Sequence, residues 1–131
     1  MNKQYRAAFT RDIRNVAAAR QGIAGFAAGC GFSELDVSDI RLAAGEALSN
    51  AVEHGSAAPA RKIMVRCFFD GSVLAIEIAD SGRGFVEPSD CTHVVPDDRG
   101  RGFGIFLMRR LMDEVTFARN GTIVRMLRRR S

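Results

Sequence analysis

The fold of this chain is decided by the stretch from Asp80 to Gly104, which opens with Asp80-Ser81-Gly82-Arg83-Gly84-Phe85 and closes with Gly100-Arg101-Gly102-Phe103-Gly104. Glycine lets a backbone approach a ligand closely and adopt conformations that other residues avoid. Two such clusters around the irregular, proline-containing span 86–99 therefore suggest a nucleotide held beneath a lid. The context strengthens this interpretation, because an apolar run ends on Asp80 and an apolar helical pattern begins just after Gly102.

A β-hairpin is predicted immediately before this stretch. Two β-rich runs, residues 61–69 and 72–80, are joined by Asp70-Gly71, which is a strong hairpin signal. The second run is almost continuously apolar, as expected for the middle of a sheet, and it ends on the carboxylate of Asp80. That carboxylate could accept a hydrogen bond from an exocyclic amine such as that of adenine, or it could simply cap a turn.

A long amphipathic pattern further upstream predicts a helix that starts at Ser33-Glu34-Leu35-Asp36 and ends at His54. Glu46 and Asn50 are four residues apart in it, so their side chains share one edge of the helix. The amide oxygen of Asn50 could coordinate Mg²⁺, and Glu46 could accept a proton from a hydroxyl group. The alternative is that both residues belong to a solvated helix face, where charged side chains are usually found.

The other elements are predicted from periodicity and from turn residues. We expect a short strand at residues 4–9, a helix from 13 to about 30, a helix at 104–112, and a final hairpin of strands 114–119 and 122–127 around Asn120-Gly121. Glycines precede the helix at 104–112, and the exposed backbone amides of its first turn would suit a phosphate group. At 131 residues, the chain is expected to form one domain spanning residues 1–131.

Composition excludes several classes of protein. Hydrophobic residues make up 47% of the chain and charged residues 26%, as in ordinary globular proteins. No apolar run approaches the roughly 20 residues of a membrane span, so no membrane contact is expected. The first six residues lack the apolar core of a signal peptide, which favours a cytoplasmic location. Three cysteines without Cys-x-x-Cys spacing indicate buried thiols rather than disulfides or a zinc site.

The formal net charge is +4, and part of the excess lies in a basic tail at the end of the chain, at Arg125, Arg128, Arg129 and Arg130. Such a tail is usually a solvated strand end, and no aromatic residues interleave with it. Direct nucleic-acid binding is therefore not expected.

The chain resembles the GHKL ATPase superfamily in three motifs that follow one another in order: Glu46-x-x-x-Asn50, Asp80-x-Gly82-x-Gly84 and Gly100-x-Gly102-x-Gly104. Within the superfamily it looks most like the stand-alone anti-sigma factor serine/threonine kinases of bacteria, because residues 46–55 and 111–115 are similar to segments of that group. The resemblance covers nearly the whole chain. It implies the Bergerat fold, an α+β two-layer sandwich whose mixed, mostly antiparallel sheet is covered on one face by helices.

The resemblance also implies catalytic roles for matching residues. Asn50 would coordinate the Mg²⁺ that bridges the ATP phosphates, and Glu46 would act as general base on the hydroxyl of a substrate serine. A lid arginine, either Arg99 or Arg101, would contact the γ-phosphate. These are the types of group that phosphoryl transfer requires, since in-line transfer needs mainly positioning and charge neutralisation.

The rest of the ATP site is likewise implied by the resemblance. Asp80 would read the amino group of adenine, and Gly82 and Gly84 would let the backbone approach the base and ribose. The triphosphate would be bound by the second glycine cluster, at Gly100, Gly102, Phe103 and Gly104.

Partners, too, follow from the resemblance. Kinases of this group hold a sigma factor as a homodimer and phosphorylate a STAS-domain anti-sigma antagonist on serine, and their first strand and first helix build the dimer and partner surface. Arg20 falls where that helix could present an arginine to an acidic partner, although simple solvation would also explain it. His54 and His93 are the only histidines, and neither lies in a phosphoacceptor box, so a sensor histidine kinase is not indicated.

Two other functions are compatible with the sequence. The first is a nucleotide-dependent protein-binding switch of the same fold with little kinase activity, for which loss of Glu46 would be the sign. The second is a basic nucleic-acid-binding or structural α/β domain, which would leave the ordered set of Asn50, Asp80 and Gly102 unexplained.

Overall fold

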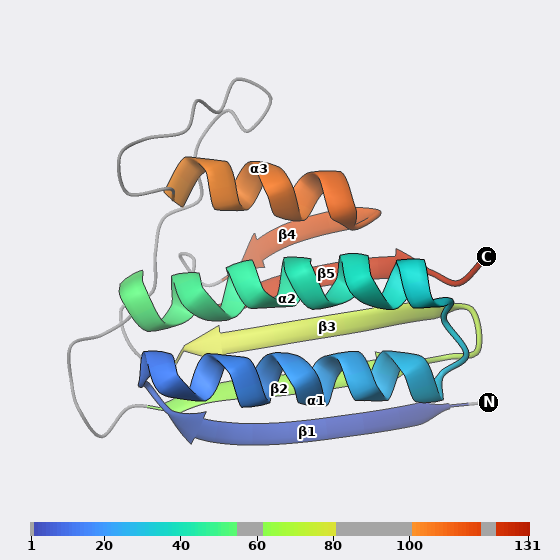
Figure 1. Cartoon of the computed structure of the whole chain (residues 1–131), viewed down its shortest axis with the longest axis horizontal. Helices are drawn as coiled ribbons and strands as arrows, with labels where there is room; N and C mark the ends of the chain where they lie inside the picture. Colours follow the sequence, from blue (N-terminus) through green and yellow to red (C-terminus); the bar gives the residue numbers. More distant parts are fainter. Residues whose placement is uncertain (1, 55–61, 81–100, 119–122) are drawn as a thin grey trace.

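A five-stranded antiparallel sheet, covered on one face by helices, forms the core of this structure, a computed structural model that describes residues 2–54, 62–80, 101–118 and 123–131 (Figure 1). The elements in chain order are β1 (Lys3–Thr10), a 3-10 turn (Ile13–Asn15), α1 (Val16–Gly29), α2 (Glu34–His54), β2 (Lys62–Phe69), β3 (Val73–Asp80), α3 (Arg101–Leu111), β4 (Glu114–Ala118) and β5 (Ile123–Arg129). The strand order is β1-β2-β3-β5-β4. The predicted α+β two-layer architecture is confirmed, and all pairings between the described strands are antiparallel.

The turn between β2 and β3 forms as its sequence predicts. Gly71 has a φ angle of 102°, a conformation that residues with a Cβ rarely adopt. The Asp70 carboxylate accepts hydrogen bonds from the backbone amides of Ser72 at 2.9 Å and Val73 at 2.8 Å, and these bonds lower the pKa of Asp70. Asp70 and Gly71 therefore fix the conformation of the hairpin turn by contacts within the turn itself. The Asn120-Gly121 turn predicted further along lies outside the described residues.

The boundary between α1 and α2 is also set locally. Gly31, with a φ angle of 92°, follows the last residues of α1. The amides of Gly31 and Phe32 donate to the carbonyls of Ala28 and Ala27, which is the hydrogen-bond pattern of a Schellman C-cap. Ser33 then caps α2, because its hydroxyl accepts a hydrogen bond from the Asp36 amide at 3.1 Å. These two caps turn the chain so that α2 runs back along α1, against which it packs.

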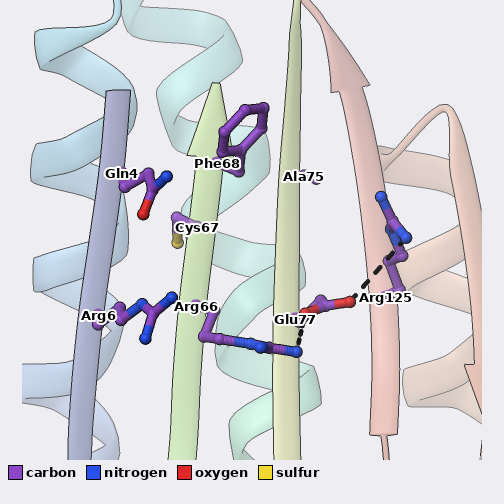
Figure 2. Close-up of a pocket in the computed structure, with 8 residues that line it drawn as sticks. All are labelled: Gln4, Arg6, Arg66, Cys67, Phe68, Ala75, Glu77 and Arg125. Carbon is purple, nitrogen blue, oxygen red and sulfur yellow. Dashed lines mark hydrogen bonds and ion pairs between the residues drawn. The ribbon is translucent and has the colours of Figure 1, made fainter. Parts of the chain in front are cut away.

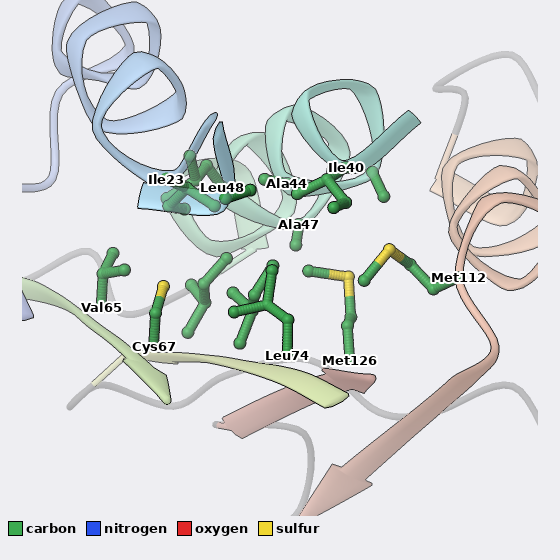
Figure 3. Close-up of a cluster of buried hydrophobic side chains, with 14 of the residues drawn as sticks. Ile23, Ile40, Ala44, Ala47, Leu48, Val65, Cys67, Leu74, Met112 and Met126 are labelled. Atoms are coloured by element: carbon green, nitrogen blue, oxygen red, sulfur yellow. The ribbon is translucent and has the colours of Figure 1, made fainter. Parts of the chain in front are cut away.

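The core lies between the helices and the inner face of the sheet (Figure 3). Small residues of α2, Ala44 and Ala47, face the sheet and let the helix approach it closely. Larger side chains fill the layer around them, among them Ile23, Ile40, Leu48, Ile76 and Met126. Cys30 and Cys67 are buried and free, as predicted, and burial raises the pKa of the Cys67 thiol to about 12. Cys91 lies outside the described residues.

The helix of the second glycine cluster begins earlier than predicted. The sequence indicated a helix at 104–112, whereas α3 runs from Arg101 to Leu111 and therefore includes Gly102 and Gly104. Glycine weakens a helix only modestly, so packing against a neighbour overrides its propensity. That neighbour is α2, against which α3 packs.

Two arginines of the basic tail join separate parts of the chain instead of being solvated. Arg128, only 17% exposed, lies 2.6 Å from the Asp36 carboxylate and also donates to the carbonyl of Leu111. Arg130 donates to the carbonyl of Cys30 at 2.8 Å and lies over the ring of Phe69. These contacts bind the end of β5 to the helix layer, and they give the arginines a structural role that the sequence does not reveal.

Two glycines of α1 are expected to respond oppositely to substitution by alanine. A Cβ on Gly25 would meet no atom within 4 Å, so Gly25→Ala should stabilise the fold by about 0.5–1 kcal/mol through helix propensity. A Cβ on Gly22 would clash with the Tyr5 hydroxyl, and Tyr5 stacks on Phe26. Gly22→Ala should therefore destabilise the fold by about 1–3 kcal/mol. Urea unfolding measures both changes, and equal effects of the two substitutions would contradict this packing.

Candidate active site

Glu46 and Asn50 lie on the side of α2 that faces α3. Asn50 is only 4% exposed, and its Nδ2 atom has no hydrogen-bond partner among the described residues. Glu46 is half-buried, whereas Glu53, two turns further along α2, is exposed. The alternative that both residues belong to a solvated helix face is therefore wrong for Asn50, and Glu46 is only partly exposed. An unsatisfied polar group in a buried position is rare in folded proteins and calls for a partner such as a water molecule, an ion or a ligand.

Gly104 brings α3 against these two side chains. A Cβ on Gly104 would lie 2.8 Å from Oε2 of Glu46 and 3.8 Å from Nδ2 of Asn50. Real Cβ atoms do not approach a carboxylate so closely, so a side chain at position 104 would require either the Glu46 carboxylate or α3 to move. The structure thus brings together three of the predicted site residues, one from the second glycine cluster and two from α2.

The environment of Glu46 favours the protonated form of its carboxyl group. Burial raises the pKa of Glu46, and the negative charge of Glu53 raises it further. A carboxylate with a raised pKa is a stronger base once it is ionised, which suits a group that must take a proton from a hydroxyl near neutral pH.

Arg20 reaches the same part of α2 from α1. Its Cδ and Nη1 atoms would lie 3.1 and 3.5 Å from a Cβ on Gly45, the residue before Glu46, and its Nε atom is buried without a partner among the described residues. The side chain therefore lies across α2, so simple solvation does not describe it. Sequence reasoning did not identify Gly45 as part of the site. The only indication was that it is a glycine inside a predicted helix, where glycine often allows close packing of a neighbouring side chain.

The other predicted site residues are described in part or not at all. Asp80 ends β3, as predicted, but its side chain lies outside the described part of the structure, as do those of Arg101 and Phe103 in the first turn of α3. Four further residues fall wholly outside it: Gly82, Gly84, Arg99 and Gly100. The choice between Arg99 and Arg101 therefore stays a prediction.

The side chains at the α2–α3 contact are chemically suited to Mg²⁺ and a phosphate chain. The carboxamide of Asn50 offers an oxygen, the ligand type that Mg²⁺ prefers, and its amide has an unused hydrogen-bonding group. The first turn of α3 lies beside it, and the first amides of a helix have no partner within that helix. A hard cation and a phosphate group therefore fit the residues present.

A sheet with helices on one face, a carboxylate and a carboxamide on the middle helix, and a glycine-containing helix packed against both define an ATPase domain of the GHKL class. The chain matches the histidine kinase-like ATPase domain family over residues 9–128. It therefore belongs to that family, and within it to the group of bacterial anti-sigma factor kinases. Among the described helices, none is long and apolar enough to cross a membrane.

Individual relatives support this assignment. The chain is 30% identical over 127 residues to an anti-sigma F factor of Thermoanaerobacter pseudethanolicus, covering 90% of this chain and 87% of the relative. It is 33% identical over 105 residues to the serine-protein kinase RsbW of Bacillus licheniformis, covering 73% of this chain and 66% of the relative. A crystal structure of RsbU and RsbW domains from Mycobacterium tuberculosis has the same fold, with a TM-score of 0.70 and 19% identity over 98% of this chain and 32% of that one.

Proposed function

We propose that this protein is an ATP-dependent protein serine kinase that acts as an anti-sigma factor in a partner-switching pathway. Its substrate is a STAS-domain antagonist, which it phosphorylates on serine. The observation that supports this most directly is the contact of Gly104 with Glu46 and Asn50, because it unites a candidate base, a candidate metal ligand and the helix of the phosphate-binding cluster. Relatives named anti-sigma F factor and serine-protein kinase RsbW support the same function.

In the proposed reaction, Glu46 accepts the proton of the substrate serine hydroxyl. The serine oxygen forms a bond to the γ-phosphorus of ATP, and the bond from that phosphorus to the bridging oxygen breaks, releasing ADP. Asn50 would hold Mg²⁺, and the ion would supply positive charge that neutralises the phosphates. Asp80 is proposed to bind the adenine amino group, and the glycine clusters the remainder of the nucleotide.

The proposed partners are a sigma factor and the antagonist, engaged in the cytoplasm by a homodimer. We place the contact of this homodimer at β1, because β1 is an edge strand of the described sheet and edge strands have backbone groups without a partner in their own sheet. Residues 1–131 are proposed to work as one ATPase domain.

The experiment that tests the kinase assignment is incubation with labelled ATP, Mg²⁺ and candidate STAS-domain proteins, followed by phosphoserine analysis. Transfer of label to serine supports the kinase. Tight ATP binding without transfer to any candidate would favour the alternative, a nucleotide-dependent protein-binding switch.

Asn50→Ala is expected to abolish most of the contribution of Mg²⁺ to ATP binding. Its carboxamide is the candidate metal ligand, and its Nδ2 has no partner among the described residues, so its removal should change the ligand-free fold little. Thermal unfolding with ATP in the presence and absence of Mg²⁺ measures the effect, since a ligand that binds the native state raises the midpoint. If Mg²⁺ protects Asn50→Ala as strongly as the natural protein, Asn50 does not hold the metal.

Transfer should fall as pH decreases through the raised pKa of Glu46, because only the ionised carboxylate accepts a proton. Glu53→Gln removes one of the two causes of that raised pKa, so the acidic limb of the kcat/KM profile should move to lower pH. At higher pH, where Glu46 is ionised in both proteins, the two rates should agree. A limb that stays in place or moves to higher pH would show that Glu46 is not the titrating base.

A further inference from the structure

The sheet face opposite the helices carries a row of charged side chains across four strands (Figure 2). Arg6 of β1 pairs in register with Arg66 of β2, Arg66 with Glu77 of β3, and Glu77 with Arg125 of β5. We call this surface the open face and define it by the row together with Gln4, Met64, Phe68, Ala75 and Ala79. Three guanidinium groups and one carboxylate leave the row with an excess of two positive charges.

The single carboxylate of the row does not reach Arg6. Arg66 donates to Glu77 at 2.6 Å, and Arg125 lies 4.0 Å from the other oxygen of Glu77. Within the described residues, Arg6 makes no hydrogen bond or ion pair, and it stands opposite Arg66. Like charges directly opposite each other destabilise a pair of strands. A negative group supplied from outside the chain would therefore be stabilising between Arg6 and Arg66.

Apolar side chains flank the row. Phe68 and Met64 lie on either side of Arg66 along β2 and are 40% and 45% exposed. The small Ala75 and Ala79 are opposite them on β3. A hollow of about 210 Å³ results, lined by Arg6, Arg66, Phe68 and neighbouring residues. Arginine and exposed large apolar residues are enriched where proteins bind other proteins.

We propose that the open face docks an acidic segment of a partner protein. A carboxylate of that segment lies against Arg6 and Arg66, where guanidinium groups can bind it with paired hydrogen bonds, and an apolar side chain packs against Phe68. The positive excess on the open face favours an acidic protein segment over the other possible binding partners. A second copy of this chain would bring the same positive excess against itself, and a nucleic acid would place phosphates beside Glu77 and the apolar flanks.

This surface is separate from the candidate active site, because Glu46, Asn50 and Gly104 lie in the helix layer on the other side of the sheet. A partner on the open face leaves the α2–α3 contact uncovered. Docking should therefore not require ATP, and the proposal stands or falls independently of the kinase assignment.

The test is selection of random dodecapeptides displayed on phage against the natural protein, with counter-selection against Arg6→Glu. Arg6→Glu places opposite charges across β1 and β2, so the variant should fold at least as stably. The peptides retained should combine Asp or Glu with large apolar residues. Their Kd, measured by fluorescence anisotropy without ATP, should be weaker by about tenfold or more for Arg6→Glu. Phe68→Ser should weaken it as well.

The matched control is Arg41→Glu, which makes the same change of charge at an exposed position of α2. It should leave the Kd within about twofold, as expected for a charge remote from the contact. The proposal is overturned if no peptide depends on Arg6, if the retained peptides lack acidic residues, or if Arg41→Glu weakens binding equally. It is also overturned if sedimentation shows a dimer that Phe68→Ser disrupts as strongly as Arg6→Glu, or if duplex DNA binds through Arg6 while no peptide does.

Discussion

Replacing Glu46 with glutamine is expected to reduce phosphoryl transfer to serine by a factor on the order of 10²–10⁴, which is the usual contribution of a general base. Glutamine keeps the shape of the side chain beside Gly104 but cannot accept the hydroxyl proton. Binding of Mg²⁺-ATP should remain, because the metal ligand, Asn50, is untouched. Single-turnover transfer from labelled ATP and binding of a fluorescent nucleotide measure the two effects separately.

Glu53→Gln is the matched control for this experiment, because it removes the same charge from an exposed position of the same helix. It should retain the full rate at pH values where Glu46 is ionised. If Glu46→Gln keeps its transfer rate, Glu46 is not the base. If it loses nucleotide binding together with transfer, Glu46 has a structural role instead.

Stability should change in the opposite direction to activity in Glu46→Gln. A carboxyl whose pKa is raised in the folded state binds its proton more tightly there than in the unfolded chain. Folding therefore gains stability as pH falls through that pKa, and at neutral pH the ionised group lowers stability. Glutamine removes this penalty, so the variant should melt a few degrees higher at neutral pH than the natural protein. Such trade-offs are common at active sites.

Gly104→Ala is expected to reduce transfer by on the order of 100-fold, because misplacing reactive groups by about 1 Å has effects of this size. The added methyl group would lie 2.8 Å from Oε2 of Glu46, so either the carboxylate or α3 must move. Both movements disturb the site, since α3 contains Gly102 and Gly104 of the predicted phosphate-binding cluster and Glu46 is the candidate base. Nucleotide affinity should fall as well, in contrast to Glu46→Gln.

Gly25→Ala provides the control, because Gly25 is also inside a helix but has open space around its Cα atom. It should leave transfer and nucleotide affinity unchanged. The double variant Gly104→Ala/Glu46→Ala should recover nucleotide affinity without transfer, because the shorter side chain relieves the clash. Full activity of Gly104→Ala would contradict the close approach of the two helices.

Local signals in the sequence were sufficient for the elements of the fold. The Asp70-Gly71 turn and the helix start at Ser33 each depend on a few neighbouring residues, and the structure confirms both. Apolar periodicity predicted the helices and strands because it, too, depends only on residues close together in the sequence. The start of α3 was mistaken by three residues, because its glycines act as helix breakers locally whereas packing against α2 keeps them helical.

The candidate site was only partly predictable. The four-residue spacing of Glu46 and Asn50 placed them on one edge of a helix, but spacing alone could not tell whether that edge is solvated or buried. Burial depends on what packs against the helix, and here that element is α3, which comes much later in the chain. The contact of Arg20 with α2 beside Gly45 could not be predicted for the same reason, since it exists only because α1 and α2 pack against each other.

By itself, the sequence determined the order of the elements, the turns between them and the types of residue available for chemistry, because these depend on neighbours along the chain. Only the tertiary structure decided that Asn50 is buried, that Gly104 touches Glu46, and that Arg128 and Arg130 hold β5 to the helices. It also decided that Arg6, Arg66, Glu77 and Arg125 form one row, because strand register aligns residues that are far apart in the sequence. These contacts join distant segments, and their geometry follows from packing and register rather than from local propensity.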